Sequence, residues 1–318
     1  MDKLPIDDAT RALAARYIRK QVNQLRKRLG DLPDPPSPKP VHKARVATRR
    51  LKAALAMLGE AFDPDDVHRW DEELKVLRKR LGPARDCDVQ IRFLRTTRKK
   101  ASRRDRPGVE LLLEESRKQR RRQQPKVAKA ARALQKSGVL DEMKRRMKRA
   151  QEAFDDDGPL LTETVFLRCR DAILHRLDAL TDKAYVLEDA DDHHGHHQMR
   201  IAAKHLRYTL EIARGGLGDV VAPMQEAAEQ VQDILGDIHD CDVWVDHLQE
   251  LLSGDGTALD EATRPGVEML SAERREHRRK RFAEMRALWA TIREENIEGE
   301  LRMFLQRDPA ELVDDLHV

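Results

Sequence analysis

The chain has 318 residues, of which 37% are charged and only 4% aromatic. No uninterrupted apolar run approaches the roughly 20 residues that span a bilayer, and the first residues lack a secretory apolar segment, so we expect no membrane span and a cytoplasmic location. Three cysteines, Cys87, Cys169 and Cys241, form no disulfide framework and are typical of small buried side chains in a reducing compartment.

The net charge of +4 conceals an uneven distribution along the chain. Residues 1–150 contain 42 Lys and Arg against 20 Asp and Glu, a net charge of +22, and the remaining residues carry −18. Such a split indicates a basic half suited to a polyanion and an acidic half that would repel it or neutralise the first half. The charge distribution alone therefore predicts that a polyanion binds to the first half of the chain only.

Helical periodicity dominates the chain, and no segment alternates with period two. In the first half it predicts helices at residues 8–29, 41–58, 64–81, 86–101, 107 onward and 140–154. The Pro-rich segment 32–40 should be extended, Gly82 and Pro83 should break a helix, and Pro125 should kink or divide another.

In the second half, helices are expected at residues 162–180, 197–213, 221–235, 240–252 and 265–297. The intervening segment before residue 197 reads as an acidic, His-rich loop. The predicted fold is all-α, with two pseudo-symmetric antiparallel bundles of four or more helices each. We place the first bundle at 1–154 and the second at 155–318.

Three sequence blocks occur twice, in the same order and at nearly constant spacing. Residues 42–52 match 197–207 at an offset of 155, 81–89 match 235–243 at 154, and 106–110 match 264–268 at 158. Such a repeat indicates two copies of one structural unit.

The first repeated block carries a polar stripe beside an apolar one. On a helix, His42, Arg45, Arg49 and Lys52 share one face, and the second copy repeats the spacing with His197, Arg200, Lys204 and Arg207. The cationic groups would recur about every 5–6 Å, which suits a linear polyanion better than a single phosphate. The alternative is a solvated flank whose side-chain stems cover the edge of the core.

The histidines and the acidic motif each allow two interpretations. His42 and His197 could be hydrogen-bonded packing residues, or they could donate to a phosphate once an anion overcomes the nearby cations. The carboxylates of Asp-Cys-Asp could cap helix N-termini or could orient the Arg and His side chains. They lie at Asp86, Asp88, Asp240 and Asp242.

Other charged segments are less specific. The basic runs 98–106, 117–122 and 274–281 wind around their helices, so much of each should be solvated surface. Residues 193–197 could capture a transition metal but have no counterpart in the first copy. Two carboxylates alone fall short of a full set of oxygen ligands, and we predict neither a metal site nor a cofactor.

The pattern His-x-x-Arg-x-x-x-Arg-Arg-Leu-Lys at 42–52, followed by Leu-Gly-x-x-Arg-Asp-x-Asp at 81–88, resembles the CHAD family, the conserved histidine α-helical domain. The resemblance covers almost the whole chain. It implies two helical bundles that bind inorganic polyphosphate on a basic surface, often at polyphosphate granules. The implied contacts are His42, Arg45, Arg49, Arg50, Lys52, His197, Arg200, Lys204, His205 and Arg207, supported by Arg85 and the four Asp residues of the acidic motifs.

The second copy departs from the pattern. His205 occupies the position of Arg50, His239 that of Arg85, and Gln198 that of Lys43, which weakens this half as a contact at neutral pH. Many relatives are fused to a triphosphate-hydrolysing domain marked by Glu-x-Glu-x-Lys on a strand. The nearest match, residues 71–75, differs at its first position and is predicted helical.

The sequence therefore predicts a non-catalytic protein whose partner is inorganic polyphosphate. One alternative is nucleic-acid binding through the same basic half, but the few aromatic residues are not interleaved with the repeated cations, so base stacking has little support. Another is phosphotransfer or metal chemistry at His42 and His197, for which the sequence supplies neither a metal triad nor a nucleotide loop.

Overall fold

The structure, a computed structural model, describes residues 4–35, 37–154, 160–254 and 259–314. Over these ranges it is helical and contains no strand, which confirms the all-α prediction. The first half comprises α1 (Asp8–Leu29), α2 (Lys39–Leu58), α3 (Pro64–Lys100), α4 (Arg106–Ser137) and α5 (Val139–Glu152). The second half comprises α6 (Glu163–Thr181), α7 (His193–Leu217), α8 (Ala222–Ser253), α9 (Arg264–Glu294), α10 (Ile297–Leu305) and α11 (Pro309–Asp314).

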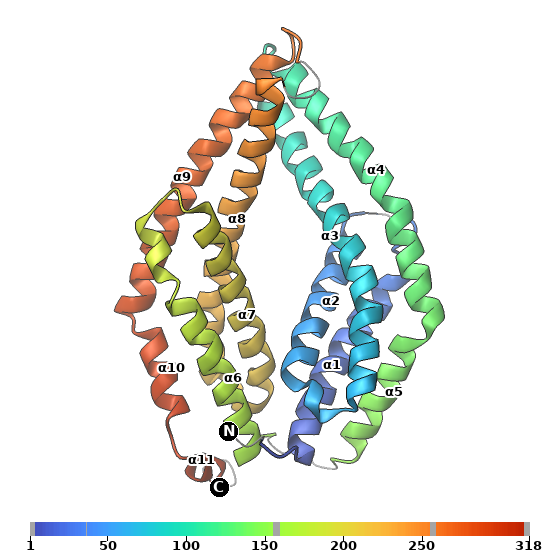
Figure 1. Cartoon of the computed structure of the whole chain (residues 1–318), viewed down its shortest axis with the longest axis vertical. Helices are drawn as coiled ribbons and strands as arrows, with labels where there is room; N and C mark the ends of the chain where they lie inside the picture. The colour runs from blue at the N-terminus through green and yellow to red at the C-terminus, as the bar shows by residue number, and fades with distance from the viewer. Residues whose placement is uncertain (1–3, 36, 155–159, 255–258, 315–318) are drawn as a thin grey trace.

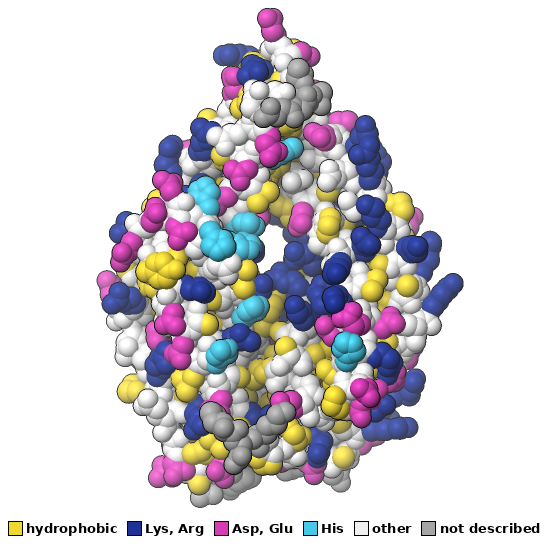
Figure 2. Space-filling view, viewed as in Figure 1, with side chains coloured by type: hydrophobic (Ala, Val, Ile, Leu, Met, Phe, Trp, Pro, Cys, Tyr) yellow, Lys and Arg dark blue, Asp and Glu magenta, His cyan; other side chains and the backbone are white. Residues whose placement is uncertain are grey.

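The two halves stand side by side and meet at opposite ends of the molecule (Figure 1). The long helices α3 and α4 reach α8 and α9 at the tip, while α1 and α2 approach α6 and α7 near the base. A hollow separates the halves between these ends (Figure 2). The predicted boundary follows α5 and adjoins residues 155–159, which lie outside the described ranges, so this division of the chain stays a prediction.

The long helices run through the predicted breaks. α3 is a single helix of 37 residues with Pro83 inside it, and α4 likewise contains Pro125. The expected break at Gly82 was wrong because Leu81, Ala84 and Cys87 continue one buried face across it. Packing of that face offsets the hydrogen bond that proline removes. In the second half, α8 is similarly continuous through Gly236.

At the tip, the third repeated block packs against its own copy. A Cβ added to Gly108 of α4 would lie 2.2 Å from the carbonyl oxygen of Thr263, and one added to Gly266 of α9 would lie 2.1 Å from that of Asp105. Only glycine allows the two helix starts to approach this closely. The surrounding cluster of buried side chains contains Leu94, Val109, Leu112, Leu113, Trp244, Leu248, Val267 and Leu270.

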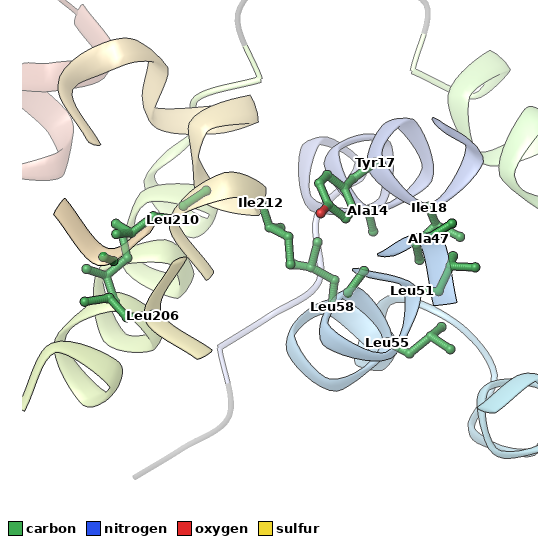
Figure 3. Packing of buried hydrophobic residues seen from close by; sticks show 14 of the residues in the cluster. Ala14, Tyr17, Ile18, Ala47, Leu51, Leu55, Leu58, Leu206, Leu210 and Ile212 are labelled. Atoms are coloured by element: carbon green, nitrogen blue, oxygen red, sulfur yellow. The ribbon is translucent and has the colours of Figure 1, made fainter. Parts of the chain in front are cut away.

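At the base, one apolar core extends through both halves. Ile212 of α7 points toward Tyr17 of α1 and Leu58 of α2 (Figure 3). Leu13 of α1 packs so closely on Gly215 that an added Cβ there would lie 2.7 Å from its Cδ1 atom. The halves are therefore held by apolar contact at both ends.

No helix within the described ranges combines the length and apolar character needed to cross a membrane. Cys87, Cys169 and Cys241 are free and buried. Burial raises the pKa of the Cys169 thiol to about 12 and that of Cys241 to about 11, so both are protonated at neutral pH.

Candidate anion-binding site

The polar stripes of the two repeated helices face the same hollow. α2 and α7 are in contact across the junction between the halves, and Lys and Arg side chains gather on the wall of the hollow (Figure 2). Seven cations from α2, α3 and α7 are close enough to influence one another, and we call them the cation cluster. They are Arg45, Arg49, Lys52, Arg85, Arg92, Arg200 and Lys204.

Arg49 lies near the middle of the cation cluster. Burial lowers the pKa of its guanidinium, and the neighbouring Arg45 and Arg200 lower it further. Its Cζ atom lies 5.6 Å from the ring centroid of Tyr208 on α7, so the side chain crosses from one half to the other. The partial negative charge of a ring face offers it some compensation.

Lys204 reaches into the cluster from the second half. Burial lowers the pKa of its ammonium to about 8, and repulsion from Arg49, Arg200 and Lys52 adds to the shift. No carboxylate lies within 4 Å of any member of the cluster among the described residues. The cluster therefore holds several positive charges that repel one another, and no described carboxylate is in direct contact with them.

Histidines surround the cluster and are mainly uncharged at neutral pH. Burial first, and then Arg85 and Arg45, lower the pKa of His42. Burial and Arg200 also lower the pKa values of His197 and His239, whose ring centroids are 4.4 Å apart.

His205 shows the strongest effect among these histidines. Burial, followed by Lys204 and Arg176, lowers its pKa to about 4. The histidine that replaces Arg50 of the first copy therefore adds no positive charge at neutral pH. The second half contributes to the cluster mainly through Arg200 and Lys204.

Two of the predicted contacts are engaged with carboxylates. Arg50 forms a 2.9 Å ion pair with Glu211 of α7, and Glu211 also accepts a 3.1 Å hydrogen bond from the Tyr17 hydroxyl. Arg207 pairs with Glu229 of α8 at 2.5 Å. These arginines hold helices together, and pairing leaves less of their charge for a ligand.

The second carboxylate of each acidic motif forms an ion pair with the long helix that follows. Asp88 accepts a 2.8 Å bond from Nε of Arg120, and Asp242 a 2.5 Å bond from Nε of Arg278. Both arginines lie in basic runs, at an offset of 158. The helix-cap interpretation was wrong because α3 and α8 are continuous here; the carboxylates fasten α3 to α4 and α8 to α9.

The first carboxylate of each motif lies beside the cation cluster instead. Burial raises the pKa of Asp86, and the nearby Arg45 and Arg85 oppose that rise. Burial likewise raises the pKa of Asp240, and the nearby Arg200 opposes that rise. Neither forms an ion pair within the described structure, so each supplies only a diffuse negative charge at the edge of the cluster.

The sequence-based site lacked Arg92. This residue lies two helical turns after Arg85 on α3, and both Arg85 and His42 respond to its charge. The seven-residue spacing was the available signal, since it places two side chains on one face. The second copy has Asp246 at the matching position, so the repeat itself does not point to Arg92.

Residues 193–197 form the beginning of α7, so the expected His-rich loop is helical. The Asp192 side chain caps this helix by accepting a 2.7 Å bond from the Gly195 amide. His196 is buried, and its Nε2 atom lies 3.0 Å from the Val186 carbonyl. Across the ranges the structure covers, no group of three or more His, Cys, Asp or Glu side chains is arranged to hold a metal ion.

These features define a class of all-helical protein with two joined halves and a cation cluster between them. The family model of the CHAD domain matches residues 16–249. Because this match covers well over half of the sequence, the chain belongs to the CHAD family.

Solved structures share the fold. The crystal structure of the CHAD domain from the plant Ricinus communis matches with a TM-score of 0.61 and 23% identity, covering 91% of this chain and 94% of that chain. PptA from Streptomyces chartreusis matches with a TM-score of 0.61 and 15% identity, covering 87% and 98%. A comparison with curated proteins finds no match.

Proposed function

We propose that this chain binds inorganic polyphosphate in the hollow between its halves and does not catalyse a reaction on it. The observation that carries the proposal is the cation cluster, in which seven Lys and Arg side chains repel one another and form no ion pair among the described residues. An anion bound there would relieve their mutual repulsion and would accept charge-assisted hydrogen bonds.

The arrangement favours a chain over a single phosphate. The α2 stripe runs from His42 to Lys52, a span of about 15 Å at the rise of an α-helix. Arg200 and Lys204 of α7 approach the same stripe from the opposite half. A ligand with negative charge along its length could contact both helices at several points, and release of its counterions would favour binding.

Removing two central cations tests the assignment. We expect Arg45→Ala with Arg49→Ala to weaken polyphosphate binding at least tenfold, because several charge-assisted contacts are lost at once. Binding should be measured by titration with polyphosphates of defined length at several salt concentrations. The length at which affinity saturates would give the span of the site.

A matched control removes the same charge elsewhere. Lys129 and Arg132 are exposed on α4, the outer helix of the first half in Figure 1. Lys129→Ala with Arg132→Ala should leave affinity nearly unchanged. If both double variants lose affinity equally at unchanged helicity, binding depends on overall charge and the hollow is not the site.

Competition and product analysis test the rest of the proposal. Polyphosphate should displace DNA or RNA at fixed salt, because the cluster offers cations and, in Tyr208, a ring that is buried rather than open to a base. Incubation with labelled polyphosphate should give neither shortened chains nor phosphohistidine. Either product would show that the protein is an enzyme.

A further inference from the structure

A cavity of about 700 Å³ adjoins the cation cluster at the junction of the two halves. Its walls come from α2, α6 and α7, with Arg78 added from α3. This volume lies within the usual range for a site that encloses a small organic molecule. We call it the Tyr208 cavity, after the buried tyrosine that lines it.

One side of the Tyr208 cavity is apolar. Ala53, Ala56 and Met57 line it from α2 and Ala172 lines it from α6, whereas Tyr208 behind them is only 5% exposed. A chain made solely of phosphate groups gains nothing by covering such a surface. A ligand with an apolar or aromatic body would gain, because its contact with these side chains removes apolar area from water.

The other side of the cavity is cationic. Lys52, Lys204 and Arg176 line it without a carboxylate partner among the described residues, and Arg49 extends over Tyr208. The one carboxylate in the lining, Asp171, already pairs with Arg170 at 2.9 Å. The cavity therefore combines an apolar wall with a cationic rim.

From this combination we infer that the Tyr208 cavity binds a small organic phosphate that carries an aromatic body. The phosphate would contact Lys52, Lys204 and Arg176, and the body would lie against Ala56, Met57 and Ala172. This goes beyond polyphosphate binding but shares Lys52, Lys204 and Arg49 with that proposed site. The two ligands should compete, so the small phosphate would act as a regulator of chain binding.

Paired probes separate the contribution of the aromatic body from that of the phosphates. ATP is compared with tripolyphosphate, and 2-naphthyl phosphate with orthophosphate, by calorimetric titration of the full chain without divalent cations. We expect the member with the body to bind at least tenfold more tightly in each pair. Equal affinity within both pairs would overturn the inference.

Filling the cavity provides the matching test. Ala56→Phe and Ala172→Phe place a side chain in the space of the aromatic body from two different helices. Each should weaken binding of ATP and 2-naphthyl phosphate at least tenfold and leave long-chain polyphosphate within about twofold. Ala287→Phe, on the exposed face of α9, is the control and should change neither.

The outcomes distinguish this inference from the proposed function. If the aromatic phosphates bind and polyphosphate does not, the inference stands and the proposed function fails. If polyphosphate binds while two correctly folded cavity variants retain full affinity for ATP, the Tyr208 cavity is not the ATP site. The inference then fails and the proposed function stands. Circular dichroism and thermal unfolding establish that each variant is folded.

Discussion

The two carboxylates of the Asp-Cys-Asp motif, separated by one residue, have different structural roles. Asp88 is 8% exposed and is bonded to Arg120, whereas Asp86 lies beside Arg45 and Arg85 without an ion pair in the described structure. Removing one partner of a buried ion pair leaves the other charge without compensation, which costs about 3–5 kcal/mol. Removing the Asp86 carboxylate leaves no ion-pair partner without compensation.

We therefore predict different effects for substitutions at these positions. Asp88→Ala should lower the free energy of unfolding by about 3 kcal/mol, as measured by urea denaturation. Asp86→Asn should leave stability nearly unchanged and strengthen polyphosphate binding, because it removes a negative charge near the cluster. The assigned roles are wrong if Asp86→Asn is the destabilising change.

Histidine protonation gives the site a pH dependence. Burial and nearby cations lower the pKa values of His42, His197 and His239 in the free protein. An anion in the hollow would raise them, so binding takes up protons. We expect affinity to strengthen as the pH falls from about 7.5 to about 5.5.

The stability of the free protein should change in the opposite direction. Below a pH of about 6.5 the unfolded chain binds more protons at these histidines than the folded chain does, so unfolding becomes easier as the pH falls through that value.

The protons taken up when polyphosphate binds can be measured by calorimetric titration in buffers of different ionisation enthalpy. His42→Gln with His197→Gln should reduce this uptake, whereas His68→Gln, on the exposed face of α3, should not.

At the scale of the elements, helix content could be predicted from sequence but helix ends could not always. Gly82-Pro83 is a local helix-breaking signal that was overridden by burial of residues on either side. Pro125 likewise does not divide α4. Burial depends on the partner helix and is absent from a local pattern. Repetition of the Arg-Pro-Gly-Val-Glu block was visible, yet nothing in it predicted that the two copies would touch.

The contact between those copies makes a prediction for the tip. Gly108→Ala should destabilise the protein by about 1–3 kcal/mol, because its Cβ would meet backbone atoms that cannot rotate away. Gly82→Ala is the control, since an added Cβ there meets no atom within 4 Å. It should stabilise α3 by about 0.5–1 kcal/mol, the usual gain inside a helix. Equal unfolding midpoints for both variants would contradict the close approach.

At the scale of the molecule, repetition and charge stripes predicted which helices would carry the site. They did not predict which cations would remain unpaired. Arg50 and Arg49 are adjacent in sequence, but only Arg50 finds Glu211, a residue 161 positions later. That pairing depends on how one half rests on the other. The Tyr208 cavity escaped prediction for the same reason, because its walls come from both halves.

The opposite net charges of the two halves have a further consequence for a bound polyanion longer than the hollow. Its protruding ends would be drawn over the half that carries +22 and pushed away from the half that carries −18. Each protein molecule bound to the polyanion would then turn its acidic half away from it. Neighbours along one long polyanion would repel one another at separations below a Debye length of about 8–10 Å, so added salt should allow them to sit closer together.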